Sequence, residues 1–301
     1  MVVGGSFLVF VWGVYVLCRL WLKCVEERYY TEMTLRPFRV SKPIVGMVHL
    51  KPLPGSPMYG GDFRRVVDSA LEDAGRLVDG GVDGLLVENY WDMPYQAGKA
   101  ASETVASMAV ITAKIVDEFG VPVGVNILRN DAEAALAVAA ASGARFVRVN
   151  VYGGVYVSME GLLMGEARKI LKLRNLLHVD AEIWADIHVK HAWPLTQIPI
   201  EEEALDVYSR CLADALVLTG RCTGAPPERV SLEAVRRAVP DAPLVIGSGL
   251  NPENAEELLR LANGAIVGTY FKEGGIIGRP VDVDRVRRLM DAVESLRCGD
   301  A

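Results

Sequence analysis

The strongest constraint on the fold is an eightfold alternation of short apolar runs with segments of helical period. The predicted strands, rich in β-branched residues, are 43–49, 82–88, 122–127, 144–150, 182–188, 214–219, 243–247 and 264–268. The predicted helices are 63–79, 101–119, 132–142, 159–177, 201–212, 232–238, 252–261 and 284–296. Strands that are apolar throughout are typical of parallel sheets buried on both faces. The pattern therefore predicts an α/β protein with the (β/α)8, or TIM-barrel, fold.

The amino-terminal segment, residues 1–32, differs from the rest of the chain. Residues 2–18 carry no charged side chain, and the apolar character resumes at residues 20–22. This is about the length that one membrane-spanning helix needs. Three interpretations stay open: a membrane anchor over residues 2–22, a spurious extension ahead of a true start at Met33, or a hydrophobic helix buried in the fold or in an oligomer. Residues 33–301 are expected to form one barrel domain.

Composition narrows the partners and the compartment. The chain has 32 Lys and Arg against 38 Asp and Glu, a formal net charge of −6, and no basic cluster that could follow a phosphate backbone. Nucleic acid is therefore excluded as the main partner, whereas a small anionic substrate needs only a local pocket. The five cysteines form no C-x-x-C pair, which suits a reducing compartment. We expect a cytoplasmic homo-oligomer, associated with a membrane only if residues 2–22 anchor it.

The fifth predicted strand carries the densest chemistry. Chemistry in such barrels lies at the carboxyl ends of the strands, and strand alternation would place Asp186, His188 and Lys190 on one inward face. This predicts acid–base chemistry in which Asp186 or His188 moves a proton and Lys190 holds an anion or forms a Schiff base. An ion-pair network that closes the top of the barrel is the structural alternative.

Polar residues at the other strand ends complete the predicted site. The predicted catalytic residues are His49, Asp186, His188 and Lys190. The predicted substrate-binding residues are Glu88, Asn126, Arg129, Asn150 and Thr219. His49 could instead be a capped core histidine. A divalent metal held by His49, Glu88, Asp186 and His188 is a further option, which the spacing alone does not decide.

Two glycine-rich loops follow the last two predicted strands. Glycine lets the backbone approach a ligand closely, and unpaired N–H groups at a helix start attract anions. Many barrels bind phosphate at this place, after strands seven and eight. The predicted phosphate-binding residues are Gly247, Ser248, Gly249, Gly268 and Thr269.

Several motifs resemble the BtpA/SgcQ family. They are VGMVHLKPLPGSP at 45–57, NILRND at 126–131, RVNV at 148–151 and ADIHVKH at 185–191, with the two glycine loops in the same order. The resemblance covers about residues 43–296 and implies a barrel similar to the ribulose-phosphate-binding barrels. One branch of that family is associated with biogenesis of the photosystem I membrane complex, and another looks like a sugar-phosphate enzyme. The hydrophobic extension departs from the family pattern.

Three functions follow from these observations. The leading hypothesis is an enzyme that isomerises, epimerises or cleaves a small phosphorylated metabolite, such as a sugar phosphate. The rival is a non-catalytic assembly factor that binds a membrane complex through the barrel surface or through residues 2–22. The third is a regulatory module that binds a sugar phosphate without converting it.

Overall fold

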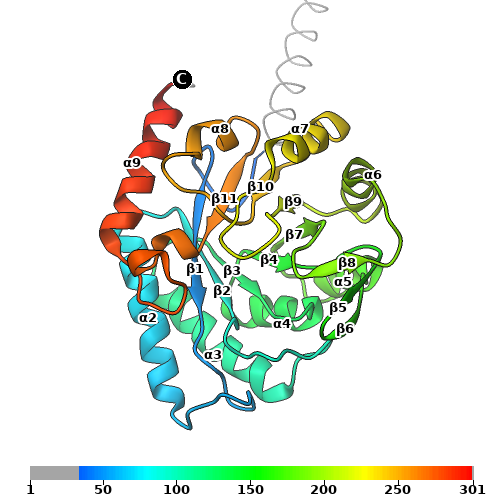
Figure 1. Cartoon of the computed structure of the whole chain (residues 1–301). Helices are drawn as coiled ribbons and strands as arrows, with labels where there is room; N and C mark the ends of the chain where they lie inside the picture. Colours follow the sequence, from blue (N-terminus) through cyan, green and yellow to red (C-terminus); the bar gives the residue numbers. More distant parts are fainter. Residues whose placement is uncertain (1–33, 300–301) are drawn as a thin grey trace, which may run out of the picture.

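The computed structural model describes residues 34–299, in which eight parallel strands close into a barrel (Figure 1). The barrel strands are β1 (Ile44–His49), β2 (Gly84–Glu88), β3 (Val123–Asn126), β4 (Phe146–Val149), β7 (Glu182–Ile187), β9 (Ala215–Leu218), β10 (Leu244–Ile246) and β11 (Gly264–Val267). They pair in chain order, and β11 returns to β1. The predicted (β/α)8 fold is confirmed.

Helices surround the barrel (Figure 1). They are α2 (Phe63–Asp79), α3 (Ser102–Glu118), α4 (Ala132–Ser142), α5 (Ala167–Leu176), α6 (Ile200–Leu205), α7 (Arg229–Ala238), α8 (Ala255–Leu259) and α9 (Val283–Gly299). A π-helical turn, η1 (Asp206–Arg210), extends α6. The Asp131 side chain caps α4 by accepting a hydrogen bond from Ala134 N, and Gly143 ends this helix at a φ of 81°.

The helix expected from residue 252 begins later than predicted. Asn251 and Asn254 each accept a hydrogen bond from the other's backbone N–H through their side-chain oxygens, at 3.0 and 2.9 Å. This reciprocal pair holds residues 251–254 as a turn, so α8 begins only at Ala255.

A second departure is a hairpin in place of the first part of the helix predicted at 159–177. The strands β5 (Val155–Ser158) and β6 (Gly161–Met164) pair antiparallel, and β8 (Ala192–Pro194) pairs with the other edge of β5. Gly161 has a φ of 121°, which favours glycine and is incompatible with a helix. The three strands form a small sheet beside the barrel mouth (Figure 1).

The inside of the barrel is filled in layers. In the lower layer, the rings of Phe146 on β4 and Trp184 on β7 stack with centroids 4.1 Å apart, and Val45, Val217 and other apolar side chains surround them. Two residues further along the same strands, the side chains are Arg148 and Asp186, which form an ion pair. The floor of the barrel is therefore apolar, and its upper layer is charged.

The predicted amino-terminal segment, including the anchor over residues 2–22 and the alternative start at Met33, lies outside the described residues. Across residues 34–299, no helix combines the length and the apolar character that a membrane crossing requires.

Candidate functional site

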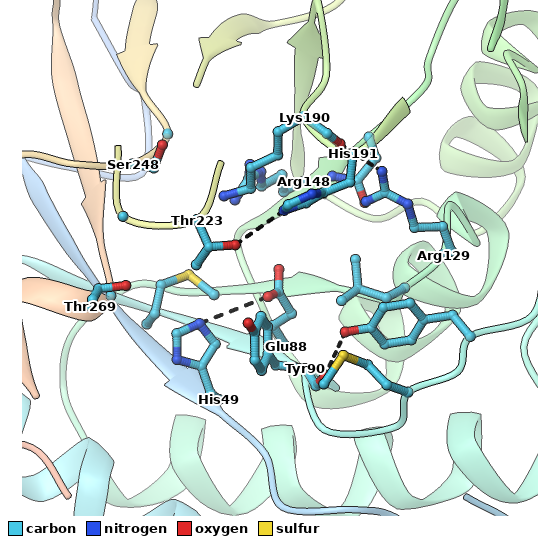
Figure 2. Close-up of a pocket in the computed structure, with 18 of the residues that line it drawn as sticks. His49, Glu88, Tyr90, Arg129, Arg148, Lys190, His191, Thr223, Ser248 and Thr269 are labelled. Atoms are coloured by element: carbon cyan, nitrogen blue, oxygen red, sulfur yellow. Dashed lines mark hydrogen bonds and ion pairs between the residues drawn. The ribbon is translucent and has the colours of Figure 1, made fainter. Parts of the chain in front are cut away.

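A cavity of about 370 Å³ opens at the carboxyl ends of the barrel strands (Figure 2). Ten of the predicted site residues line it: His49, Glu88, Arg129, Asn150, Lys190, Gly247, Ser248, Gly249, Gly268 and Thr269. The other lining residues are Met47, Tyr90, Met93, Tyr95, Leu128, Arg148, Met159, Glu160, His191, Thr223 and Gly224. Of these, only His191 was among the polar strand-end residues that the sequence offers as candidates. We call this cavity the central pocket.

A buried ion pair forms one side of the central pocket. Arg148 donates to both carboxylate oxygens of Asp186, at 2.9 and 3.0 Å, and Asn150 Nδ2 donates to Asp186 Oδ2 at 2.9 Å. The bidentate geometry fixes the guanidinium plane and offsets the cost of burying both charges. Asp186 thus lies behind Arg148, which lines the pocket while Asp186 does not.

Glu88 and His49 lie next to each other at the ends of β1 and β2 (Figure 2). Asn126 Nδ2 donates to Glu88 Oε2 at 2.6 Å, and His49 Nε2 lies 3.9 Å from Glu88 Oε1. Burial, reinforced by the charges of nearby lysines and Arg148, lowers the pKa of His49 well below its usual value. The imidazole is therefore neutral at neutral pH, and Asn126 acts from behind the pocket by orienting Glu88.

Lys190 reaches the central pocket from the loop after β7. Arg129 Nη2 donates to its backbone oxygen at 2.8 Å, which holds the loop in place. Burial, followed by the positive charge of Arg148, lowers the pKa of the Lys190 amine to about 8. Within residues 34–299, no carboxylate forms an ion pair with this amine.

The glycine loops after β10 and β11 form the opposite wall. A Cβ on Gly249, whose φ is 76°, would lie 2.1 Å from the backbone nitrogen of Pro226, and a Cβ on Gly268 would lie 2.9 Å from the His49 ring. Only glycine fits at these two positions, so the wall consists of backbone. The Ser248 hydroxyl donates to Ala225 O at 2.8 Å and accepts from Gly220 N, so it joins two loops.

The expectation that Asp186, His188 and Lys190 share one inward face is wrong at His188. β7 ends at Ile187, and His188 adopts a φ of 44°. Its Nε2 lies 3.2 Å from Ile198 O and 3.4 Å from Glu203 Oε2. His188 and Thr219 line a neighbouring cavity of about 800 Å³ instead of the central pocket.

The four residues considered for a divalent metal do not come together. Asp186 is engaged by Arg148, and His188 faces the neighbouring cavity. In the part of the chain that the structure describes, no group of three or more His, Cys, Asp or Glu side chains is arranged to hold a metal ion.

The most important residue that sequence reasoning missed is Arg148. It precedes Asn150 by two residues on the fourth strand, so the same alternation that selected Asn150 could have selected it. Tyr90, whose ring lies 4.8 Å from that of His49, follows β2 by two residues. Glu160 and Thr223 lie in loops, where neither strand alternation nor a glycine-rich motif marks them as pocket residues.

Comparisons with known proteins agree with this architecture. A family model described as the BtpA family matches residues 40–295. An uncharacterized protein of Thermococcus kodakarensis is 43% identical over 256 residues, covering 85% of this chain and 97% of that protein. The photosystem I biogenesis protein BtpA of Synechocystis is 40% identical over 256 residues, covering 85% and 89%. Among solved structures, thiamine phosphate pyrophosphorylase from Pyrococcus furiosus has a TM-score of 0.52 at 16% identity, covering 85% of this chain and 96% of that one, which shows a shared fold.

Proposed function

This chain belongs to the BtpA family, and we propose that it is an enzyme that converts a small phosphorylated metabolite, of the sugar-phosphate class, by acid–base chemistry. One observation carries the proposal: the central pocket places a backbone wall of glycines opposite a set of charged side chains. A pocket with a few convergent polar groups and residues of perturbed pKa is the usual setting of an active site.

The phosphate would bind between Arg148 and the glycine wall. A Cβ on Gly247 would lie 3.4 Å from Arg148 Nη2, so the guanidinium is next to the loop after β10. A guanidinium and backbone N–H groups together are well suited to oxyanions. Asp186, considered a catalytic group on sequence grounds, serves in this proposal to hold Arg148 in position.

The reacting carbon would lie near Lys190 and Glu88. A lysine with a pKa near 8 exchanges protons readily at physiological pH, and Asn126 orients the Glu88 carboxylate. Neutral His49 would form a hydrogen bond with the substrate, and Arg129 and Asn150 would orient it. These roles suit isomerisation, epimerisation or bond cleavage of a sugar phosphate.

A non-catalytic assembly factor is the second candidate, favoured by the name of the Synechocystis relative. The relative from Thermococcus kodakarensis, which is 43% identical, carries no such name. An assembly factor that acts through its surface also has no need of the central pocket.

A thermal-shift screen of the full chain tests the proposal. We expect phosphorylated sugars to raise Tm, because a ligand that binds only the folded state stabilises it, and the matched unphosphorylated sugars to have no effect. Turnover of the stabilising compound should be lost in Lys190→Met. If no phosphorylated compound shifts the Tm of the folded protein, the assembly factor becomes the better hypothesis.

A further inference from the structure

We infer that Lys190 forms an imine with the carbonyl carbon of the substrate, so the substrate is a phosphorylated aldehyde or ketone. This inference rests on the proposed function and deepens it. It chooses between the two roles that the sequence allowed for Lys190, an anion anchor and a Schiff-base nucleophile.

The position of Lys190 suits a nucleophile. Figure 2 shows its side chain beside Arg148 at one edge of the central pocket, with Glu88 on the other side of the cavity. The hydrogen bond from Arg129 to the backbone oxygen of Lys190 fixes the base of the side chain. The amine can therefore approach a bound substrate from a defined direction.

Burial, together with the positive charge of Arg148, disfavours the protonated form of Lys190 and outweighs the opposite effect of the Glu88 and Asp186 carboxylates. The Asp186 carboxylate is already engaged by hydrogen bonds from Arg148 and Asn150. With a pKa of about 8, on the order of a tenth of the amine is neutral at pH 7. An anion anchor gains nothing from losing its charge, whereas a nucleophile requires it.

Anion binding already has a permanent cation. The guanidinium of Arg148 stays charged at all physiological pH values and lies against the glycine wall. A second, titrating cation would add little to phosphate affinity. Lys190 is thus free for the carbonyl end of the substrate.

The imine step balances with groups present in the pocket and with solvent. The Nζ lone pair attacks the carbonyl carbon and the C=O π electrons move to oxygen. Glu88 accepts one proton from nitrogen and passes it to that oxygen, which gives the neutral carbinolamine. A proton from solvent, equal to the one that Lys190 released when it became neutral, then reaches the hydroxyl through Glu88. Water leaves while the nitrogen lone pair forms the C=N bond of the protonated imine. The protonated imine then withdraws electrons from the neighbouring carbon, which permits isomerisation or carbon–carbon cleavage.

Borohydride trapping tests the inference. The full chain is incubated at pH 7 with dihydroxyacetone phosphate, glyceraldehyde 3-phosphate or ribose 5-phosphate, then treated with sodium borohydride, which reduces an imine to a stable secondary amine. Peptide mass spectrometry should find the adduct on Lys190, enriched about a hundredfold over exposed lysines because of their higher pKa. Lys190→Met should remove it, and the matched control Lys51→Met, at an exposed site, should not.

The outcomes separate the two proposals. If phosphorylated sugars raise Tm but adducts are spread over exposed lysines, Lys190 is not the nucleophile and the proposed function still stands. If none of these compounds raises Tm and none is trapped, both proposals are overturned.

A different region carries a second, independent inference: the small sheet of β5, β6 and β8 presents an apolar outer face. The register places Val157 opposite Leu162 and Trp193, which are 40%, 57% and 64% exposed. The alternate positions, Tyr156 and Leu163, are buried against the barrel. The sheet is therefore apolar on both faces, although within residues 34–299 only the inner face is covered.

We propose that a second copy of this chain covers this outer face. Met159, Met164 and Leu195, which are 90%, 60% and 60% exposed, extend this apolar face to six large side chains, which is a suitable centre for an interface of standard size, roughly 800 Å² on each partner. No residue of the three strands is charged. Two copies that each carry a net charge of −6 would meet most favourably through such a face.

The interface would border the central pocket. Met159, in the turn between β5 and β6, is 90% exposed and also lines that pocket. A partner docked on the sheet would cover this side chain and narrow the pocket mouth.

Sedimentation equilibrium of the full chain tests the dimer. We expect a dimer that the double variant Leu162→Ser, Trp193→Ser weakens at least a hundredfold in Kd, while Val230→Ser, an equally exposed apolar site on α7, leaves it unchanged. A monomer at tens of micromolar, or a dimer that tolerates the double variant, would overturn the proposal. So would a monomer that binds vesicles of phosphatidylcholine and phosphatidylglycerol through the same two side chains.

Discussion

The floor of the barrel and the layer above it are built on the same strands but are held by different forces. On β4 and β7 the lower inward positions are Phe146 and Trp184, and the next inward positions are Arg148 and Asp186. The lower pair is stabilised mainly by apolar burial and ring stacking, and the Trp184 indole N–H also donates to Glu182 Oε2 at 2.8 Å. The upper pair is stable only while both charges are present, because either charge alone would be buried without a counter-ion. Because every second residue of a strand points inward, an apolar core position and a charged position beside the pocket lie only two residues apart on both strands.

The largest effect is expected when the upper layer loses one partner. Asp186→Ala leaves the buried Arg148 guanidinium without its counter-ion, so we expect a loss of about 3–5 kcal/mol in the free energy of unfolding. Urea denaturation measures it, with Asp186→Asn as the milder control that keeps one hydrogen-bond acceptor. A loss below about 1 kcal/mol would show that the two layers do not differ in the way described.

The matching change in the lower layer should separate stability from ligand binding. Phe146→Ala removes a stacked ring from a closed apolar layer, and we expect a similar loss of about 3–5 kcal/mol. The Tm increase caused by a phosphorylated ligand should be retained in Phe146→Ala and lost in Asp186→Ala. If both variants lose it, the lower layer also shapes the pocket.

A smaller effect on folding is expected at the glycine wall. In the Gly249→Ala protein an alanine must adopt a positive φ, which costs about 1–2 kcal/mol, and its Cβ would collide with the backbone of Pro226. The ligand-induced Tm shift should disappear because the loop moves. Gly60→Ala is the matched control, since a Cβ at that position meets no atom within 4 Å. A Gly249→Ala protein that binds the ligand normally would argue against the phosphate site.

The smallest effect is a pH dependence of the upper layer. Because the pKa of Lys190 is lowered to about 8 in the folded state, the unfolded chain holds an extra proton between about pH 8 and 10.4. The free energy of unfolding should therefore rise with pH across this window, relative to the Lys190→Met protein. Guanidinium-induced unfolding of both proteins at pH 7 and 10 measures this difference.

The sequence sufficed for the strands, for the glycine loops and for ten of the pocket-lining residues, because burial and strand alternation leave a direct pattern. It was insufficient where backbone conformation departs from that pattern. β7 ends at Ile187, and the positive φ of His188 breaks the strand alternation there. Lys190 therefore lies in a loop, where alternation no longer predicts which way a side chain points. Leu162, Leu163 and Met164 are good helix formers, yet the positive φ of Gly161 reverses the chain just before them and makes them the second strand of a hairpin. The pairing of Arg148 with Asp186, 38 residues apart, becomes visible only once β4 and β7 are neighbours.

The close contact between Gly249 and Pro226 limits how this pocket can diverge. At Gly249 and Gly268 the glycine wall is main chain, so amino-acid replacements at these two positions have no side chain to vary. Selectivity among descendants of this fold would change through Tyr90, Met159 and Thr223, which line the rest of the pocket with side chains. Substitutions at those three positions would change which substrates fit, while the part of the substrate that contacts the glycine wall would stay the same.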